Sequence, residues 1–318
     1  MIITRSPLRI SLGGGGTDLP SYYQQHGGFC IAAAIDRYVY VTIHQHFMAD
    51  LIVKYSKLER VARAADLEHP ILREALGLLH IDGPGLEISS MADIQAGTGL
   101  GSSGSFTTAL LKALHVYQHY VVDVRRVAEE ACVVELERVG APIGKQDQYI
   151  AAYGGLMALD FPMNGAGHIL AMPVSLPIDV RYELEDHLLL FFTGQTRSAS
   201  DVLKRQDPSR LDAVKGLGYQ TSATLQEGDL EHFARLLTEQ WYLKRDRCPD
   251  ANNAQIDRWI SQGLAHGALG GKLVGAGGGG FLLFYAEAKR SLRRVMRDAG
   301  LPEVRFRFDF EGTTVLAP

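Results

Sequence analysis

The sequence is most informative at Gly97-Thr98-Gly99-Leu100-Gly101-Ser102-Ser103-Gly104. Residues 86–90 before this stretch are typical of a strand, and residues 105–120 after it are typical of a helix. Glycines at such a place let successive backbone N–H groups point toward one position, and the start of the helix adds partial positive charge. The stretch therefore predicts a cradle for a polyphosphate. It is not a Walker A loop, because no Gly-Lys-Ser/Thr follows. The alternative is a plain turn in which Ser102 or Ser103 caps the helix.

The same glycines match the dinucleotide-binding pattern G-x-G-x-x-G, and Asp123 lies about twenty residues downstream, where that pattern places an acidic residue. Two features argue against a dinucleotide site. The segment 91–96 is long for a strand that turns directly into its helix. Asp123 precedes apolar residues at helical spacing, so it is expected to open a helix. A nicotinamide-dependent dehydrogenase therefore ranks third among the functions that we consider.

Composition and charge restrict the class of protein. The chain has 318 residues, of which 46% are hydrophobic and 21% charged, as in a globular protein with a real core. A net charge of −4 gives no reason to expect nucleic acid or an anionic membrane as a partner. The three cysteines, Cys30, Cys132 and Cys248, lack metal-ligand spacing, which fits a reducing compartment. No signal peptide or membrane-spanning run is evident, so we expect a cytoplasmic protein.

Strands and helices are intermixed without strict alternation, which predicts an α+β fold with two domains that face each other. We expect the domains to be residues 1–170 and 171–318, because 163–177 contains glycine and prolines typical of a junction. Strands are expected at 8–12, 29–35, 38–44 (paired with 29–35), 51–55, 86–90, 156–161, 180–184, 188–193, 271–274, 281–285 and 304–309. Helices are expected between 55 and 86 and at 105–120, 124–139, 148–152, 200–205, 210–226, 230–244, 254–266 and 288–299.

A second glycine-rich segment lies near the N-terminus, where the strand 8–12 runs into Gly13–Gly16 and then Thr17-Asp18. Such a turn lets the backbone approach a ligand closely, and the Asp18 carboxylate would accept ligand hydroxyls. Asp18 could equally cap a helix that begins at Pro20.

Two further carboxylates are candidates for chemistry. Glu135 falls in the middle of the apolar stripe of the helix 124–139, where a carboxylate is costly unless it meets a cation. A magnesium ion on a nucleotide would satisfy it, and so would an ion pair with Arg9, Arg138 or another basic residue. Asp147 lies just before an apolar helix start, so it could accept a proton from a hydroxyl nucleophile or cap that helix.

A third glycine run, within 270–281, is flanked by Leu273, Val274 and Phe281. A flexible linker would lack such apolar flanks, and a hairpin needs only two to five loop residues. Close approach of the backbone to a ligand is the better explanation.

Together these segments resemble the GHMP kinase family, in order and spacing from Pro7 to Phe281. The resemblance implies an N-terminal domain like ribosomal protein S5, a ferredoxin-like C-terminal domain and an active site between them that binds ATP and Mg²⁺. It implies Asp147 as the catalytic base with Arg9 beside it, and Ser103 and Glu135 as magnesium ligands. The ATP phosphates would contact Gly97, Thr98, Gly99, Leu100, Gly101, Ser102 and Ser103. The substrate would contact Gly15, Gly16, Thr17, Asp18, Arg197, Gly277, Gly278 and Gly279.

Within the family, Gly-Gly-Gly-Gly-Thr-Asp-Leu-Pro and Gly-Lys-Gln-Asp-Gln-Tyr most resemble kinases of D-glycero-D-manno-heptose 7-phosphate. That subgroup phosphorylates the anomeric hydroxyl on the route to GDP-heptose for bacterial surface polysaccharides. We hypothesise that Arg197 helps hold the phosphate that the sugar already carries, and the alternative is an arginine on the protein surface. The sequence departs from the family pattern at two places. Gln95 stands near the position of the proline that often precedes the phosphate loop in the family. Gly15-Gly16 stands where galactokinases have Glu-His, which argues against galactose as the substrate. Two alternative functions remain: a kinase for another sugar such as fucose, and a non-catalytic sensor of ATP and sugar. The protein could also form a homodimer.

Overall fold

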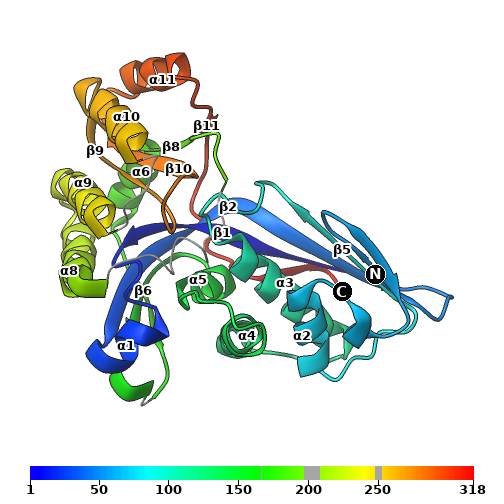
Figure 1. The fold of residues 1–318 in the computed structure, drawn as a ribbon. Helices are drawn as coiled ribbons and strands as arrows, with labels where there is room; N and C mark the ends of the chain where they lie inside the picture. The colour runs from blue at the N-terminus through cyan, green and yellow to red at the C-terminus, as the bar shows by residue number, and fades with distance from the viewer. Residues whose placement is uncertain (166, 197–207, 248–252) are drawn as a thin grey trace.

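The computed structural model describes residues 1–165, 167–196, 208–247 and 253–318 (Figure 1). Its strands form two sheets, and helices cover both. The strands are β1 (Ile2–Gly13), β2 (Gly28–Gln45), β3 (Leu51–Lys54), β4 (Leu58–Val61), β5 (Leu86–Ala92), β6 (Leu156–Phe161), β7 (Leu170–Pro173), β8 (Leu188–Phe192), β9 (Ala268–Leu273), β10 (Phe281–Ala286), β11 (Glu303–Val304) and β12 (Thr314–Ala317). The helices are α1 (Pro20–His26), α2 (Pro70–Leu78), α3 (Ser102–Tyr117), α4 (Val124–Cys132), α5 (Gln146–Tyr153), α6 (Ile178–His187), α8 (Leu211–Glu227), α9 (Leu230–Arg247), α10 (Asn253–Ala265) and α11 (Lys289–Asp298).

The first sheet has the strand order β12-β1-β2-β5-β3-β4, with β6 pairing β2 and β7. Its longest strand, β2, corrects the prediction of two paired strands at 29–35 and 38–44. Both segments lie in one continuous strand, and both pair with β1. The register passes from Leu8–Ile35 to Pro7–Tyr38, so Asp36 and Arg37 form a bulge.

Alternation along β1 decides which side chains reach the site. Leu8, Ile10 and Leu12 point into a core that also contains Leu190 and Phe233 of the second half. Arg9 and Ser11 therefore point to the opposite face, toward α5. Helices α2 to α5 lie along this face of the first sheet in Figure 1, whereas the second sheet and α8 to α11 lie at one end of it.

The second sheet has the order β11-β8-β10-β9 and is antiparallel throughout. This order confirms the ferredoxin-like arrangement expected for the C-terminal half. The strand predicted at 180–184 is wrong, because these residues belong to α6. Val180 and Leu184 are four residues apart and so share one face of that helix, which packs them against the core.

The division of the chain into two domains at residue 170 remains a prediction. Two strands at or after this residue, β7 and β12, pair with strands of the first sheet. The boundary falls at the start of β7, which pairs with β6 in the first sheet. The last strand, β12, returns from the second half and pairs with β1, so the two termini lie close together (Figure 1). The strand predicted at 304–309 is only the short β11, and neither β4 nor β12 was predicted. Among the described residues, no helix is long and apolar enough to cross a membrane.

Candidate active site

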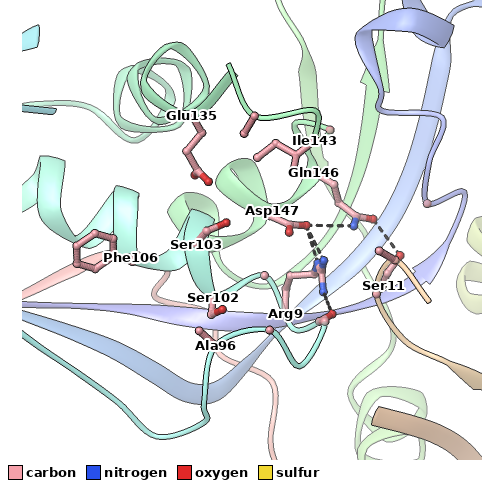
Figure 2. Close-up of a pocket in the computed structure, with 18 of the residues that line it drawn as sticks. Arg9, Ser11, Ala96, Ser102, Ser103, Phe106, Glu135, Ile143, Gln146 and Asp147 are labelled. Carbon is pink, nitrogen blue, oxygen red and sulfur yellow. Dashed lines mark hydrogen bonds and ion pairs between the residues drawn. The ribbon is translucent and has the colours of Figure 1, made fainter. Parts of the chain in front are cut away.

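A cavity of about 790 Å³ lies where the two halves meet. Its walls come from β1, the glycine loop 96–103, the start of α5, the glycine run 275–279 and one face of α9. Figure 2 shows Ser102, Ser103 and Glu135 on one side of the Arg9–Asp147 pair, and Ser11 and Gln146 on the other. Residues from four of the predicted motifs are therefore brought into one cavity.

The glycine loop has the geometry of an anion cradle. Gly97, Gly99 and Gly101 have φ values of 79°, 84° and 77°, a backbone region in which only glycine is unstrained. Among the described residues, no hydrogen bond uses a backbone N–H of residues 97–103 as its donor. These donors lie at the start of the sixteen-residue helix α3, whose dipole adds positive charge. Gly101, not a serine, is the N-cap of α3, so the alternative of a serine cap is wrong.

The second glycine run supports this loop from the other half of the chain. A Cβ atom on Gly275, whose φ is 80°, would lie 2.5 Å from Gly99 Cα. A Cβ atom on Gly280 would collide with the Thr98 carbonyl oxygen. The glycine run thus approaches the backbone of the first loop closely, whereas the predicted close approach to a ligand stays a prediction. The two loops thus form one wall of the cavity, and side chains at these positions would separate them.

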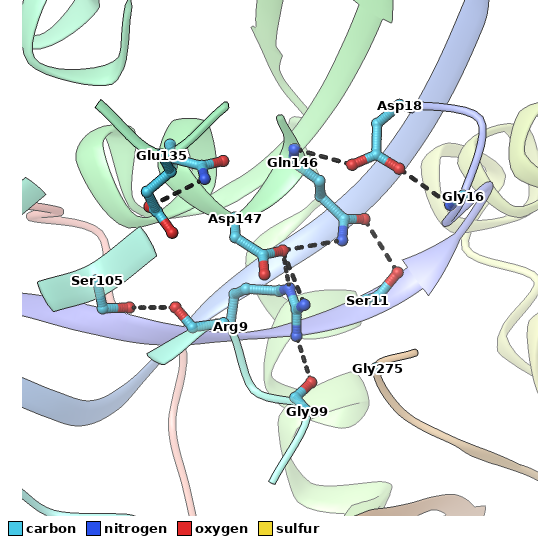
Figure 3. Close-up of polar contacts among 12 residues, drawn as sticks. Arg9, Ser11, Gly16, Asp18, Gly99, Ser105, Glu135, Gln146, Asp147 and Gly275 are labelled. Atoms are coloured by element: carbon cyan, nitrogen blue, oxygen red, sulfur yellow. Dashed lines mark hydrogen bonds and ion pairs between the residues drawn. The ribbon is translucent and has the colours of Figure 1, made fainter. Parts of the chain in front are cut away.

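Arg9 connects the glycine loop to the predicted base. Its side chain is 6% exposed, and its Nε and Nη2 atoms lie 2.8 Å and 2.7 Å from Asp147 Oδ1 (Figure 3). Its Nη1 atom donates to the Gly99 carbonyl oxygen at 2.6 Å, and its backbone N–H donates to the Leu100 carbonyl. A guanidinium with several donors in one plane suits this double task. Arg9 therefore fixes Asp147 and the cradle relative to each other.

Asp147 is the second residue of α5, and Lys145 is its N-cap. The alternative that Asp147 caps this helix is therefore wrong. Its carboxylate lies in the first turn, where the helix dipole favours negative charge. The side chain is 26% exposed and lines the cavity, so an acceptor hydroxyl can reach the oxygen that Arg9 leaves open.

Asp18 lies beside Gln146, on the side away from Asp147 (Figure 3). Its Oδ1 accepts the Gly16 N–H and its Oδ2 accepts the Gln146 N–H, both at 3.0 Å. It does not cap α1, whose N-cap is Leu19. Burial raises the pKa of Asp18, while the two backbone donors oppose the shift. A Cβ on Gly144 would collide with this carboxylate. Each carboxylate oxygen retains a lone pair for a ligand hydroxyl.

Glu135 is buried, as its place on the apolar stripe predicted. The helix is not regular there, because α4 ends at Cys132 and a π-helical turn spans Val133–Arg138. Such turns are common at functional sites. Glu135 Oε1 accepts a 3.0 Å hydrogen bond from Gln148 Nε2. Burial raises the pKa of Glu135 to about 7, although contacts with Gln148, Ser103 and Thr107 favour the charged form.

The surroundings of Glu135 fit a magnesium ion. Among the described residues it forms no ion pair, and Arg9 and Arg138 pair with Asp147 and Glu74 instead. The exposed Ser103 contributes a hydroxyl beside it, at the mouth of the phosphate cradle. No group of three acidic, His or Cys side chains that could hold a metal occurs in the described part of the chain. One carboxylate, one hydroxyl and nucleotide phosphates together are a typical magnesium set.

Comparisons with known proteins agree with this geometry. The family models for the N-terminal and C-terminal domains of GHMP kinases match residues 57–155 and 222–300. This chain belongs to the GHMP kinase family. Its curated relatives include a D-glycero-alpha-D-manno-heptose 7-phosphate kinase of Campylobacter jejuni, 26% identical over 90% of this chain and 89% of that protein. They also include an L-fucokinase/L-fucose-1-P guanylyltransferase of Bacteroides fragilis, 27% identical over 95% of this chain but only 37% of that longer protein. A solved D-glycero-D-manno-heptose 1-phosphate kinase from Bacteroides thetaiotaomicron shares the fold, with a TM-score of 0.82, 24% identity, and coverage of 100% of this chain and 99% of that chain.

As a GHMP kinase, the chain is an ATP-dependent kinase with an α+β fold. The third-ranked dehydrogenase interpretation is wrong. Asp123 is the N-cap of α4, where its carboxylate accepts the Arg126 N–H at 3.0 Å, so it is no ribose ligand at a strand end.

Not every predicted residue of this GHMP kinase lines the cavity. Thr17 is fully buried, and its hydroxyl bonds the Gly14 and Phe29 carbonyls, so it holds the glycine turn in shape. Thr98 and Leu100 are buried inside the loop. Arg197 lies outside the described residues. Gly278 is buried beside the cavity wall, whereas these predicted residues line it: Arg9, Gly15, Gly16, Asp18, Gly97, Gly99, Gly101, Ser102, Ser103, Glu135, Asp147, Gly277 and Gly279.

Sequence reasoning missed both ends of the cavity. One end carries aromatic rings: His69 lies 4.6 Å from Tyr55 and 5.4 Å from Phe106, ring centroid to centroid. Nothing local marks these residues, because they come from three separate elements. The other end carries Lys244, Arg247 and Lys272. Lys272 lies within the glycine-rich segment 270–281, and that position was its signal in the sequence.

Proposed function

We propose that this kinase transfers the γ-phosphate of ATP to the anomeric hydroxyl of D-glycero-D-manno-heptose 7-phosphate, giving the 1,7-bisphosphate. The observation that carries the proposal is the row formed by the glycine loop, Arg9, Asp147 and Asp18 along one cavity wall. A phosphate donor at one end of this row and a polyhydroxylated acceptor at the other would meet at Asp147. The match to a heptose 7-phosphate kinase over most of both chains supports the choice of sugar.

Each group of cavity residues has a binding role that follows from its position. The loop Gly97–Ser103 binds the ATP phosphates through its N–H groups. Ser103 and Glu135 would hold Mg²⁺, which would neutralise charge on the phosphates. The aromatic end of the cavity, with Tyr55 and Phe106, receives the adenine. Asp18, with the turn at Gly15 to Thr17, positions the sugar hydroxyls, and Gly277 to Gly279 border the transferring group.

Asp147 acts as the general base. It accepts the proton of the anomeric hydroxyl while that oxygen forms its bond to the γ-phosphorus and the bond to the bridging oxygen of ADP breaks. Arg9 orients the Asp147 carboxylate through its Nε and Nη2 donors and adds positive charge near the transferring group. Phosphoryl transfer depends mainly on such positioning and charge neutralisation. General-base catalysis contributes about 10²–10⁴-fold.

A second acceptor has support of its own. The match to a fucokinase covers 95% of this chain at 27% identity, so L-fucose is the main rival sugar. A non-catalytic sensor of ATP and sugar is less favoured, because a protein that only binds needs neither Asp147 nor its arginine. We further propose that the enzyme works in the cytoplasm, in the supply of heptose for capsule or lipopolysaccharide. A homodimer stays open until the mass in solution is measured.

The test is ADP release from ATP and Mg²⁺ across a panel of D-glycero-D-manno-heptose 7-phosphate, free heptose, mannose, fucose and galactose. Turnover confined to the heptose 7-phosphate, and lost in Asp147→Asn, is the expected result. Turnover of fucose alone would retain the kinase and replace the sugar. Tight ATP binding without turnover of any sugar would favour the sensor.

The role of Arg197 has its own test within the same assay. If its guanidinium holds the phosphate of the sugar, Arg197→Ala raises KM for the sugar phosphate and leaves KM for ATP unchanged. An unchanged KM for the sugar phosphate would remove Arg197 from the site.

A further inference from the structure

Cationic side chains gather at the end of the cavity that lies in the second half of the chain. Lys244 and Arg247 come from the last turns of α9, and Lys272 comes from β9. Gln240, Lys244 and Arg247 are three or four residues apart, so they share one face of α9, and all three line the cavity. None of them has a role in the catalytic steps described above.

The Lys272 side chain is buried and forms hydrogen bonds with two neutral groups. Its side chain donates to the Leu12 carbonyl at 3.0 Å and to Gln240 Oε1 at 2.8 Å, and both acceptors are neutral. No ion pair between described residues includes Lys272, although it is only 7% exposed. An ammonium group has three N–H donors, so one is left for another acceptor.

The charges around Lys272 make this arrangement costly without an anion. Burial lowers its pKa well below the usual value, and the neighbouring Lys244 and Arg9 lower it further. Buried cations are normally paired with an anion, because desolvation is otherwise uncompensated. The buried ammonium group of Lys272 therefore has the surroundings of a group that pairs with an anionic ligand in the cavity.

Strand β1 indicates where an anionic group bound to Lys272 would lie relative to the reacting hydroxyl. Arg9 holds Asp147 at the reacting end, and the Leu12 carbonyl holds Lys272 three residues further along the strand. At about 3.3 Å per residue, the backbones of Arg9 and Leu12 are roughly 10 Å apart, a span comparable with an extended seven-carbon sugar. The ATP phosphates already have the glycine loop and Arg9.

We propose that Lys272, together with Lys244 and Arg247, binds a phosphomonoester that the acceptor sugar already carries, at the end remote from the reacting hydroxyl. The proposal rests on the proposed function in taking the acceptor to be a sugar, and it names the cations that select a phosphorylated one. A phosphate dianion relieves the repulsion between Lys272 and Lys244, and the planar guanidinium of Arg247 suits the phosphate oxygens. An unphosphorylated sugar leaves the buried charge uncompensated.

The experiment distinguishes binding of the phosphate group from binding of the sugar. With the nucleotide site saturated by Mg²⁺ and a non-hydrolysable ATP analogue, calorimetry measures binding of inorganic phosphate, of heptose 7-phosphate and of free heptose. The wild type is expected to bind heptose 7-phosphate at least about tenfold more tightly than heptose. Lys272→Met abolishes this preference and weakens phosphate binding by a similar factor, whereas Lys272→Arg retains most of both. Arg235→Met, on the exposed side of α9 where Arg235 pairs with Glu231, leaves both unchanged.

Each contrary result has a distinct meaning. Equal binding of phosphorylated and free heptose by the wild type, or phosphate binding that Lys272→Met does not weaken, overturns this inference even if the kinase is active. Equal loss of affinity for the ATP analogue and for phosphate assigns the cations to the nucleotide and also overturns it. Phosphate binding as expected, without phosphorylation of any heptose, retains the inference and refutes the proposed function. If Lys272→Met does not fold, as shown by thermal unfolding, Arg247→Met makes the same comparison.

Discussion

Arg9 joins the phosphate cradle to the predicted base: its Nη1 atom lies 2.6 Å from the Gly99 carbonyl oxygen, and its Nε atom lies 2.8 Å from Asp147 Oδ1. One buried side chain thus sets the distance between the group that holds the phosphate and the group that accepts the proton. Phosphoryl transfer is sensitive to such distances, since most of its catalysis comes from positioning. The consequences can be measured on single variants.

Asp147→Asn keeps the size of the side chain and removes its basicity. We expect kcat to fall about 10²–10⁴-fold, because a positioned general base contributes about that much. Binding of the ATP analogue changes less than about twofold in calorimetry, since no nucleotide contact is lost. Asp179→Asn is the matched control, because Asp179 is also the second residue of its helix but lies exposed on α6. An Asp147→Asn enzyme that is as active as the control would refute the base assignment.

Arg9→Lys keeps the positive charge and loses the planar set of donors. A lysine cannot reach Asp147 and the Gly99 carbonyl together, so we expect kcat/KM to fall about 10- to 100-fold, the range for a lost hydrogen bond to a charged group. Arg5→Lys is the control on the same strand, where Arg5 pairs with the exposed Glu311. Steady-state kinetics that show equal small effects for both variants would mean that Arg9 supplies charge alone.

Glu135 makes stability depend on pH in the absence of Mg²⁺ and nucleotide. Burial raises its pKa from 4.5 to about 7, so its stabilising contribution is complete below pH 4.5 and is lost as pH rises through 7. The difference corresponds to about 3 kcal/mol of unfolding free energy at most. Thermal unfolding should therefore show Glu135→Gln gaining stability relative to the wild type between pH 5 and pH 8. Parallel pH profiles for the two proteins would contradict the shift, and added Mg²⁺ with nucleotide should reduce the gap.

Gly275→Ala tests the contact between the two glycine loops. Its φ of 80° disfavours alanine, and the new methyl group would lie 2.5 Å from Gly99 Cα. We expect affinity for ATP to fall at least about tenfold, because the phosphate loop must move. Gly216→Ala is the control: it lies in α8 with open space around it, so unfolding free energy should stay equal or rise by up to about 1 kcal/mol. Normal ATP affinity in Gly275→Ala would show that the loops move independently.

Sequence patterns were sufficient wherever one local feature decides the structure. Three glycines before a helix predicted the cradle, and the apolar stripe around Glu135 predicted its burial. Short-range patterns failed where long-range pairing decides. The residues 29–35 and 38–44 form one strand because β1 pairs with both halves, and no local signal distinguishes that bulge from a turn. The segment 180–184 has β-branched and apolar residues, yet it is helical because its contacts with the core lie four residues apart.

The candidate site also has features that the sequence predicts and features that only the structure shows. Its motif residues could be located from sequence, while the role of each depended on geometry. Asp18 does not cap α1 but accepts the first N–H of α5, and it lines the cavity, so its contact with ligand hydroxyls stays a prediction. The aromatic end of the cavity and the cations of α9 could not be found, since they come from segments that only folding brings together.

Phosphorus-31 NMR of the reaction product tests the central claim most directly. The wild-type enzyme is incubated with ATP, Mg²⁺ and D-glycero-D-manno-heptose 7-phosphate, and the product is examined for a second phosphorus coupled to the anomeric proton. We predict that this signal grows as ADP accumulates and is absent with Asp147→Asn. ADP formation with the new phosphorus on another carbon, or no phosphorylation of this sugar at all, would contradict the account.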